Sequence, residues 1–518
     1  MSDIATAWSQ ILAAARPELQ RLEPAFADPR AAQTALLCDI LEKNRVTSFG
    51  LAHDFARIRD PDDYRRAVPI RSYEELKTWI EATARGETNV LTSDPVIAFE
   101  ETGGSTAGPK LVPYTAASLA SFRAAVLPWL AGLVGRRPAI ARGCAYVSIS
   151  PALRAPRRTV NGIAIGLPSE GAYLGSDVAT AFSRILAVPA HVASSGDVER
   201  WQTATLAALV CAPRLSLVSI WSPTFLDRLL DALETRPEDI LRHLHDLPIA
   251  PGRREGAARL ESAFADGRLD THRLWPHLDT VSCWADGASE PFARQLGTRL
   301  PHAAIEPKGL LATEAAVTLP WGGEAGCIPA LTSTFIELIG DDGCARLIDE
   351  AEPDAGYRVV VTTPGGLYRY DLGDRVRCIA FAERVPRFVF EGRAGCVSDM
   401  VGEKLTEAFA SVALAAATPY PATLVPDPGP PARYVLLLDA LAPDDERPPS
   451  FLRDLELRLG ANPQYAYARA MGQLGPLGVA YRPGYAARLQ RRALHQGKRL
   501  GDVKPAALLP SFSLVDWE

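Results

Sequence analysis

The sequence predicts an α/β protein with a large N-terminal domain and a smaller C-terminal one. Apolar runs at residues 145–150 and 215–220 are typical of buried strands, and the pattern of residues 178–186 predicts a helix between them. Such alternation favours sheets that are covered by helices. The chain has 518 residues, which is more than one domain usually contains. We therefore expect β-sheets flanked by helices over most of the chain.

The N-terminal region is predicted to be helical. Residues 33–45 and 73–85 carry apolar side chains near helical spacing, with an extended link between these two segments. A further helix is expected to begin after Thr115, whose hydroxyl suits an N-cap. Its predicted buried face contains Leu119, Phe122, Val126 and Leu130.

The second half of the chain predicts an antiparallel meander. Residues 334–339, 357–363 and 367–372 read as strands, with a turn at Gly365 and Gly366. Asp374 follows Gly373 and is expected in a tight turn. After another strand at 387–390, the sequence Gly-Arg-Ala-Gly at 392–395 predicts a flexible joint.

This joint divides the chain into an N-terminal domain, residues 1–392, and a C-terminal domain, residues 393–518. The smaller unit is predicted to contain a helix at 403–416, a strand at 434–438 and a helix at 451–459. Its last stretch places Gly501 and Lys504 in a loop.

Charge and targeting patterns exclude several classes of partner. The 55 basic and 61 acidic residues are interspersed and give a net charge of −6, so no basic stripe indicates nucleic acid or an anionic membrane. The N-terminus reads as an amphipathic helix and not as a signal peptide, and no apolar run is expected to span a bilayer. The eight cysteines form no CxxC pair, which argues against zinc and favours a reducing compartment. We expect a cytoplasmic protein.

The stretch from Thr102 to Lys110 predicts a phosphate-binding loop. It follows an apolar run at 96–99 and contains only small residues up to Gly108, so backbone N–H groups can approach a phosphate closely. A Walker A loop is excluded, because Pro109 and Lys110 stand where Lys and Ser or Thr are required. The alternative is an ordinary Gly/Ser turn between two strands.

Trp221 and Ser222 follow the predicted strand at 215–220. Ligands of open α/β sheets collect at the carboxyl ends of strands, so Trp221 is a candidate pocket residue. An ordinary core tryptophan explains this position equally well.

Four motifs, TGGSTAGPK, LLATE, LYRYDLGD and GDVKP, together carry a family resemblance. In this order and spacing they resemble the adenylate-forming superfamily, which includes acyl-CoA synthetases, luciferases and peptide-synthetase adenylation domains. The chain looks most like the auxin-responsive acyl-acid amido synthetases and their bacterial relatives. The resemblance covers nearly the whole chain and implies a large adenylation domain with a small, mobile α+β C-terminal lid.

The resemblance implies a role for each matching residue. Lys504 of the lid and Lys110 would be catalytic, and Glu314 and Thr106 would hold Mg²⁺. Trp221 and Ser222 are the candidates for the acyl pocket because of their place after the predicted strand, not because of the resemblance. The implied nucleotide-binding residues are Thr102, Gly104, Ser105, Thr106, Gly108, Thr313, Glu314, Asp374, which would bind the ribose, and Arg393 at the hinge. The sequence departs from the superfamily at Gly103 and Ala107, and Leu310 and Leu311 replace an aromatic residue that commonly stacks on adenine.

The implied activity is an ATP-dependent ligase. It would activate a carboxylic acid as an acyl-adenylate with release of pyrophosphate, and transfer the acyl group to an amine, expected to be an amino acid. Two alternatives remain: an acyl-CoA ligase with the same first step, and a non-catalytic relative that binds a ligand or partner.

Overall fold

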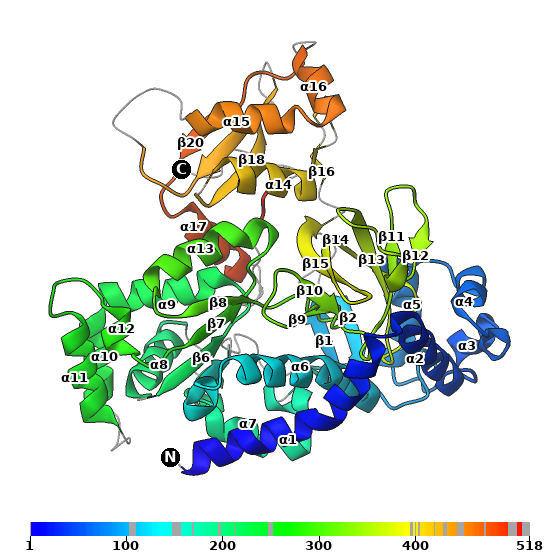
Figure 1. Cartoon of the computed structure of the whole chain (residues 1–518), viewed down its shortest axis with the longest axis horizontal. Coiled ribbons are helices and arrows are strands. Elements are labelled where there is room, and N and C mark those ends of the chain that lie inside the picture. The colour runs from blue at the N-terminus through cyan, green and yellow to red at the C-terminus, as the bar shows by residue number, and fades with distance from the viewer. Residues whose placement is uncertain are drawn as a thin grey trace.

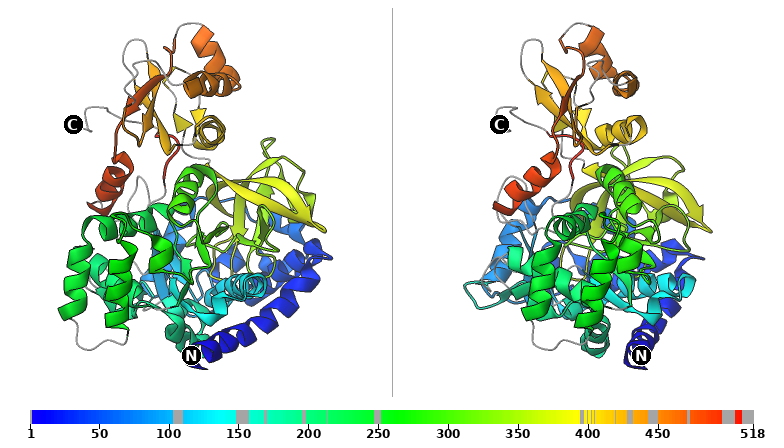
Figure 2. Two further views of the ribbon diagram at one scale, coloured as in Figure 1. Left: turned by 60° about the vertical axis from the view of Figure 1, so that its left-hand side comes forward. Right: turned by 90° about the vertical axis from the view of Figure 1, so that its left-hand side faces the viewer.

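The computed structural model describes most of the chain. The described residues are 2–102, 110–147, 157–167, 170–194, 198–212, 214–246, 252–393, 397–398, 400–401, 403, 405–418, 420–427, 432–442, 450–470, 473–495 and 505–509. Figure 1 shows a broad body with a smaller unit above it, and both turned views in Figure 2 keep the two apart except at a narrow junction. We call the smaller unit, residues 397–509, the lid.

A parallel sheet with the strand order β3-β6-β7-β8 forms one side of the body (Figure 1). Its strands are β3 (Cys144–Val147), β6 (Leu215–Ser219), β7 (Thr280–Cys283) and β8 (Ala304–Pro307). Around it lie α7 (Ser176–Ile185), α8 (Val198–Cys211), α9 (Pro223–Thr235), α10 (Pro237–Asp246), α11 (Arg253–Ala263), α12 (Thr271–Leu274) and α13 (Glu290–Arg299). The expected strand–helix alternation in this region is confirmed.

The two faces of this sheet pack against different elements. Val218 and Val281 belong to a buried cluster with Phe225 of α9, whereas Leu217 belongs to the larger cluster that contains α6 (Ala116–Arg136). Neighbouring residues of a strand point to opposite faces, so this split is expected. The parallel sheet is therefore covered on both sides, and its strand ends remain the place for a ligand.

The predicted meander is the core of a mostly antiparallel sheet with the order β12-β11-β13-β14-β15-β10-β9. Its strands are β9 (Thr318–Pro320), β10 (Cys327–Pro329), β11 (Phe335–Ile339), β12 (Ala345–Arg346), β13 (Gly356–Thr362), β14 (Tyr370–Ala382) and β15 (Val385–Arg393). Gly366 has φ +95° in the expected turn between β13 and β14.

Two sequence expectations in this sheet are wrong. Asp374 does not lie in a tight turn: β14 runs through it, and Gly373 (φ +68°) absorbs an irregularity within the strand. The Gly373 N–H donates to Asp371 Oδ1 at 2.9 Å, which holds that irregularity in place. Gly392 and Arg393 belong to β15, so this half of the expected joint is wrong, whereas Ala394 and Gly395 lie outside the described residues.

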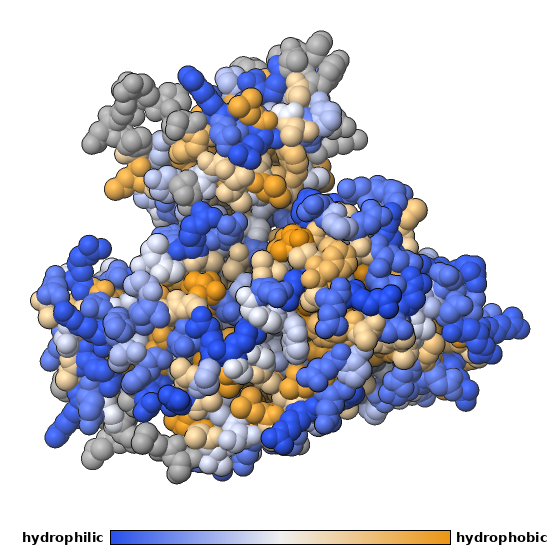
Figure 3. Space-filling model, viewed as in Figure 1, coloured by the Kyte–Doolittle hydropathy of each residue, from blue (hydrophilic) through white to orange (hydrophobic). Residues whose placement is uncertain are grey.

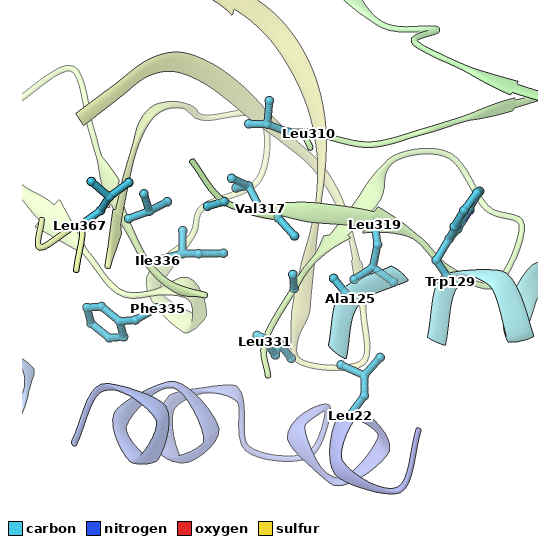
Figure 4. Packing of buried hydrophobic residues seen from close by; sticks show 14 of the residues in the cluster. Leu22, Ala125, Trp129, Leu310, Val317, Leu319, Leu331, Phe335, Ile336 and Leu367 are labelled. Carbon is cyan, nitrogen blue, oxygen red and sulfur yellow. The ribbon is translucent and has the colours of Figure 1, made fainter. Parts of the chain in front are cut away.

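The N-terminal region is helical, as predicted, and its helices pack beside this sheet. They are α1 (Ser2–Ala25), α2 (Pro29–Lys43), α3 (Ser48–Ala52), α4 (Pro61–Ala67) and α5 (Tyr73–Ala84). A small sheet with the order β2-β1-β5-β4 lies next to them, formed by β1 (Ala98–Thr102), β2 (Lys110–Tyr114), β4 (Arg157–Arg158) and β5 (Ala164–Ile165). Figure 4 shows how Leu22, Ala125, Leu319 and Ile336 meet in the buried cluster between α1, α6 and the large sheet.

Helix α6 begins as predicted, but its buried face is different. Thr115 Oγ1 accepts the Ser118 N–H at 3.1 Å. Leu130 is buried as expected, whereas Leu119, Phe122 and Val126 are only partly buried, and Leu127 and Leu133 are covered instead. By length and composition alone, helix α6 could cross a bilayer, contrary to the expectation from sequence. The core helices of soluble proteins also meet this criterion.

The lid has its own sheet and its own core. Its sheet order is β18 (Ala422–Asp427), β19 (Arg433–Leu438) and β20 (Gly478–Tyr481), with a small ladder of β16 (Val397–Ser398) and β17 (Leu405–Thr406). Its helices are α14 (Glu407–Ala417), α15 (Ser450–Leu459), α16 (Pro463–Ala470) and α17 (Tyr485–His495). The helices and strand expected at 403–416, 434–438 and 451–459 are confirmed. A separate buried cluster that includes Leu424, Leu436 and Leu455 shows that this unit has its own core.

The junction of lid and body is tight. Gly392, with φ +146°, is the last residue but one of β15, and a Cβ there would lie 3.2 Å from the Cα of Ala408 in α14. A larger residue would therefore push the lid helix away from the body. Figure 3 shows the surface narrowing at this junction, with hydrophilic side chains on both flanks of the body and hydrophobic ones scattered over its middle.

Candidate active site

The β1–β2 hairpin carries the predicted phosphate loop. Thr102 and Lys110 are the register partners at the loop end of the hairpin, so the stretch between them starts and ends at neighbouring backbone positions. Gly104, Ser105, Thr106 and Gly108 lie outside the described residues. Their role, including that of Thr106 as a metal ligand, stays a prediction.

Lys110 lies against Tyr73, at the start of α5. Its Nζ is 5.3 Å from the centre of the Tyr73 ring, and the Tyr73 hydroxyl accepts the Leu111 N–H at 2.8 Å. The tyrosine thus holds the backbone of β2 and offers its ring face to the lysine, a favourable arrangement for a cation. This contact keeps the Lys110 ammonium at the end of the hairpin.

Thr313 and Glu314 form the tip of a tight turn. Leu311 and Ala316 pair across it by an antiparallel bridge, and the Ala312 N–H donates to the Ala315 carbonyl at 2.9 Å. The Tyr114 hydroxyl, at the end of β2, donates to the Thr313 carbonyl at 2.7 Å. The phosphate hairpin and the Thr-Glu turn are therefore tied together.

Asp374 and Arg393 face each other across β14 and β15. They are register partners, and Arg393 Nε lies 3.3 Å from Asp374 Oδ1. Asp374 is 1% exposed, so its carboxylate is covered in this arrangement. The pKa of Arg393 is raised: partial burial opposes its charge, but the carboxylates of Asp374 and Glu314 outweigh that effect.

Glu314 connects these groups electrostatically. Burial raises its pKa, and the Asp374 carboxylate raises it further, while Arg393 and Lys110 lower it in part. Such mutual effects require the four side chains to share one neighbourhood. The structure thus brings together Lys110, Glu314, Asp374 and Arg393, four of the residues selected from sequence.

Leu310 and Leu311 precede this turn and stand where the superfamily commonly has an aromatic residue that stacks on adenine. Leu310 is 5% exposed and belongs to the main buried cluster, where Figure 4 shows it beside Val317. Leu311 is only partly buried. Of the two leucines, Leu311 is therefore the one placed to contact a base.

Trp221 and Ser222 follow β6 directly, as expected, but they have different surroundings. Trp221 is partly buried, with its ring centre 6.1 Å from that of Trp284 and 5.1 Å from Lys308 Nζ. Ser222 is fully buried, and its Oγ lies 2.7 Å from Thr224 Oγ1, which accepts from Gln490 Nε2 of the lid at 2.8 Å. Trp221 thus borders an aromatic wall, whereas Ser222 takes part in a contact with the lid.

Lys504 lies outside the described residues, but the segment after it is anchored. The Leu424 N–H donates to the Ala507 carbonyl at 2.8 Å, and the Leu509 N–H donates to the Leu424 carbonyl at 3.0 Å. Residues 507–509 therefore run along β18 of the lid sheet. This fixes the chain on the lid a few residues beyond Lys504.

Family profiles match the chain in two places. The GH3 family N-terminal domain matches residues 18–305, more than half of the chain, and the GH3 family central domain matches residues 334–393.

The chain belongs to the GH3 family.

Curated GH3 relatives are similar along much of the chain. A probable indole-3-acetic acid-amido synthetase of Oryza sativa subsp. japonica, GH3.6, is 29% identical over 282 residues, covering 46% of this chain and 56% of the relative. The match thus spans little more than half of that relative. Another from the same organism, GH3.4, is 24% identical and covers 97% of this chain and 90% of the relative.

Solved structures share the fold. The GH3.15 acyl acid amido synthetase superposes with a TM-score of 0.79 at 17% identity, covering 96% of this chain and 93% of that one. A 2-hydroxyisobutyryl-CoA ligase in its postadenylation state gives a TM-score of 0.51 at 12% identity, covering 90% and 85%. This GH3 chain therefore has the adenylate-forming fold with a smaller C-terminal domain, as the sequence predicts.

Sequence reasoning missed several residues of this GH3 site. The sequence placed Tyr73 and Tyr114 only within a helix and an extended run. In the structure Tyr73 contacts Lys110 and accepts the Leu111 N–H, and Tyr114 donates to the Thr313 carbonyl. Lys308 was passed over, since a lone lysine in an apolar stretch gives no signal. Its neighbours Trp129 and Trp221 come from elements far apart in sequence.

Proposed function

We propose that this GH3 chain is an ATP-dependent acyl-acid amido synthetase. It activates a carboxylic acid with ATP, releases pyrophosphate, and transfers the acyl group to the amino group of an amino acid. The observation that carries the proposal is the joint position of Lys110, Glu314, Asp374 and Arg393 beside the β1–β2 hairpin. The names of its relatives, which are amido synthetases, support the same reaction.

Asp374 and Arg393 suit the nucleoside end of ATP. A carboxylate offers two acceptors for two ribose hydroxyls. Because the Asp374 carboxylate is covered and bonded to Arg393, ribose binding requires Arg393 to give way. Arg393 ends β15 at the lid junction, so this exchange couples nucleotide binding to the position of the lid.

Glu314 suits a magnesium ion bound together with ATP. Burial and the Asp374 carboxylate raise its pKa, so an added cation would stabilise the ionised form. Mg²⁺ commonly uses one or two protein carboxylates and completes its shell with phosphate oxygens and water. Glu314, with Thr106 of the loop, would hold the ion, which neutralises phosphate charge when bound. The described residues contain no group of three or more His, Cys, Asp or Glu side chains that could hold a metal unaided.

In the first half-reaction a carboxylate oxygen of the acid attacks the α-phosphorus, and the bond to pyrophosphate breaks. The carboxylate and the phosphate are both negatively charged and have to approach each other, so positioning and electrostatic stabilisation dominate the catalysis. Lys110 and the loop N–H groups supply positive charge from the body, and Lys504 supplies it from the lid. In the second half-reaction the amine nitrogen attacks the acyl carbon, AMP leaves, and the nitrogen loses a proton to give the amide.

The test is acid-dependent isotope exchange between pyrophosphate and ATP. A screen of aromatic and aliphatic acids should give exchange with at least one of them. The best acid is then combined with either amino acids or coenzyme A, and the acyl product is identified. An amide supports the proposal, and a thioester product without an amide overturns it in favour of an acyl-CoA ligase. A chain that binds ATP but shows no exchange with any acid is a non-catalytic relative.

We also propose that the chain acts in the cytoplasm on small molecules, without nucleic acid or a membrane as partner. The interspersed charges support this, as do the cysteines of the described residues, which are free.

A further inference from the structure

Lys308 is a buried lysine at the carboxyl edge of the parallel sheet. It follows β8 directly, and 6% of its surface is exposed. Its Nζ donates to Ser219 Oγ, at the end of β6, at 2.6 Å. The same atom lies 5.3 Å from the ring centre of Trp129 and 5.1 Å from that of Trp221. An ammonium group thus lies against two indole faces at the edge where such sheets collect ligands.

Other polar groups on this face of the sheet are buried and unsatisfied. Among the described residues, Trp129 Nε1 and Ser282 Oγ have no hydrogen-bond partner. Ser282 is the register partner of both Ser219 and Glu306, so the three side chains point to the same face. Glu306 forms an ion pair with Arg136 of α6, which identifies this face as the one that α6 covers. Figure 4 shows Trp129 at the margin of the buried cluster.

These unsatisfied groups indicate what is missing. An indole N–H can only donate, so the absent partner of Trp129 must be an acceptor. An ammonium group beside it favours an oxygen acceptor, and hydrogen bonds to charged groups are the stronger kind. Buried polar groups in native proteins are nearly always paired, so an unpaired donor beside a cation points to a ligand atom.

The position of Lys308 relates this face to the reaction. Lys308 and Thr313 are joined by a short segment that spans at most about 17 Å when fully extended. Gly309 shortens it, because its φ of +74° turns the chain so closely that a Cβ would lie 2.5 Å from the Thr318 carbonyl oxygen. Lys308 therefore lies within that distance of the Thr313–Glu314 turn, which is close enough for one acid to reach from the turn to Lys308.

We propose that Lys308 and Trp129 are specificity-determining residues for the acyl acid. They bind an oxygen acceptor on the tail of an aromatic acid, remote from the carboxylate that reacts. Trp221 and Trp284 supply the flat apolar wall against which an aromatic ring packs. This inference rests on the proposed function, since it assumes that an acyl acid is the ligand.

The test uses pairs of aromatic acids that differ only by an oxygen acceptor, such as benzoate and 4-hydroxybenzoate, together with longer pairs of the same kind. Binding is measured by calorimetry, and kcat/KM by pyrophosphate exchange, for the wild type, Lys308→Met and Lys308→Arg. Lys43→Met is the matched control, because Lys43 is an exposed lysine paired with Asp39. Circular dichroism and thermal melting establish that each variant is folded.

For the best pair, we expect Lys308→Met to weaken binding and kcat/KM of the oxygen-bearing acid by about 10- to 100-fold, the loss of one charged hydrogen bond. The plain acid should change by less than about threefold. Lys308→Arg should recover part of the loss, and Lys43→Met should resemble the wild type. An equal loss for both acids, or no loss for either, overturns the inference and leaves Lys308 with a structural role.

Two further results keep the test decisive. If Lys308→Met does not fold, Trp129→Phe replaces it, since phenylalanine keeps a ring face but lacks the N–H. This variant should weaken binding and lower kcat/KM only for the oxygen-bearing acid. An equal loss for both acids overturns the inference. If the wild type binds these acids but shows no exchange, the proposed function fails while the binding comparison still decides the role of Lys308. A wild type that binds no oxygen-bearing aromatic acid but activates other acids overturns the inference alone.

Discussion

The two halves of the proposed site stabilise their cations differently. On the nucleotide side, Arg393 is bonded to the Asp374 carboxylate and lies near Glu314. On the side toward the parallel sheet, Lys308 lies against the Ser219 hydroxyl and the faces of Trp129 and Trp221. Arg393 ends β15 and Lys308 directly follows β8, but Arg393 is held by charge and Lys308 by aromatic rings and a hydroxyl.

This difference corresponds to the two kinds of ligand. A triphosphate needs charges that rearrange as it binds and reacts, and an arginine paired with a carboxylate can exchange partners. An acid tail needs a fixed shape, which buried indole rings provide. Changes on the charged side should therefore alter catalysis and ATP binding, and changes on the aromatic side should alter the choice of acid.

The largest effect is expected for Lys504→Ala. If Lys504 reaches the reacting groups from the lid, pyrophosphate exchange should slow by about 100- to 1,000-fold, the scale for losing one donor that stabilises a transition state. Acid binding, measured by calorimetry, should change little. Pyrophosphate exchange at the wild-type rate would show that Lys504 does not stabilise the reacting groups.

Asp374→Ala should weaken ATP binding by about 10- to 100-fold, because two hydrogen bonds to a charged group are lost. Acid binding should be much less affected, which would separate the two halves of the site. Asp341→Ala is the control: Asp341 is an exposed carboxylate paired with Arg375 on the same sheet. Equal losses of ATP and acid affinity in Asp374→Ala would indicate a general loss of structure.

Glu314→Gln should raise the Mg²⁺ concentration needed for exchange by about tenfold, since a charged ligand becomes neutral. It should also raise the melting temperature at neutral pH by about 2 °C. A carboxyl group whose pKa is raised on folding favours the folded state while protonated, and this contribution is lost as the pH rises through the raised pKa. The stability gap between variant and wild type should therefore narrow as the pH is lowered. A variant that melts below the wild type at neutral pH would show that Glu314 stabilises the fold as an ion.

The charged side could be predicted from sequence far better than the aromatic side. Thr313, Glu314 and Asp374 stand in contiguous motifs, because each is placed by a turn or strand whose own residues are recognisable. Trp129 and Lys308 meet only after α6 packs on the parallel sheet, and no local pattern announces that contact. The prediction of a turn at Asp374 was wrong for a related reason. Asp374 of β14 pairs with Arg393 of β15, and this pairing continues the strand past Gly373. Such non-local pairing cannot be recognised from a single segment of sequence.

The smallest effect is expected where lid and body share a buried hydrogen bond. Gln490 of α17 is 4% exposed and donates to Thr224, which lies 2.7 Å from Ser222, the neighbour of Trp221. At the start of the same helix, the Tyr485 hydroxyl lies 2.9 Å from Thr423 Oγ1 in the lid sheet. Helix α17 thus joins the lid to the aromatic side of the body. Removing the hydrogen bond from Gln490 to Thr224 should therefore lower the population of this lid position.

Gln490→Leu keeps the side-chain size but removes the donor. One neutral hydrogen bond contributes about 1 kcal/mol, so the ratio of amide formation to pyrophosphate exchange should change by about two- to fivefold, with one rate rising as the other falls. Arg488→Ala, an exposed position on the same helix, should leave the ratio unchanged. If Gln490→Leu lowers both rates equally, the bond supports the fold but does not select a lid position, because a change in lid population must favour one half-reaction over the other.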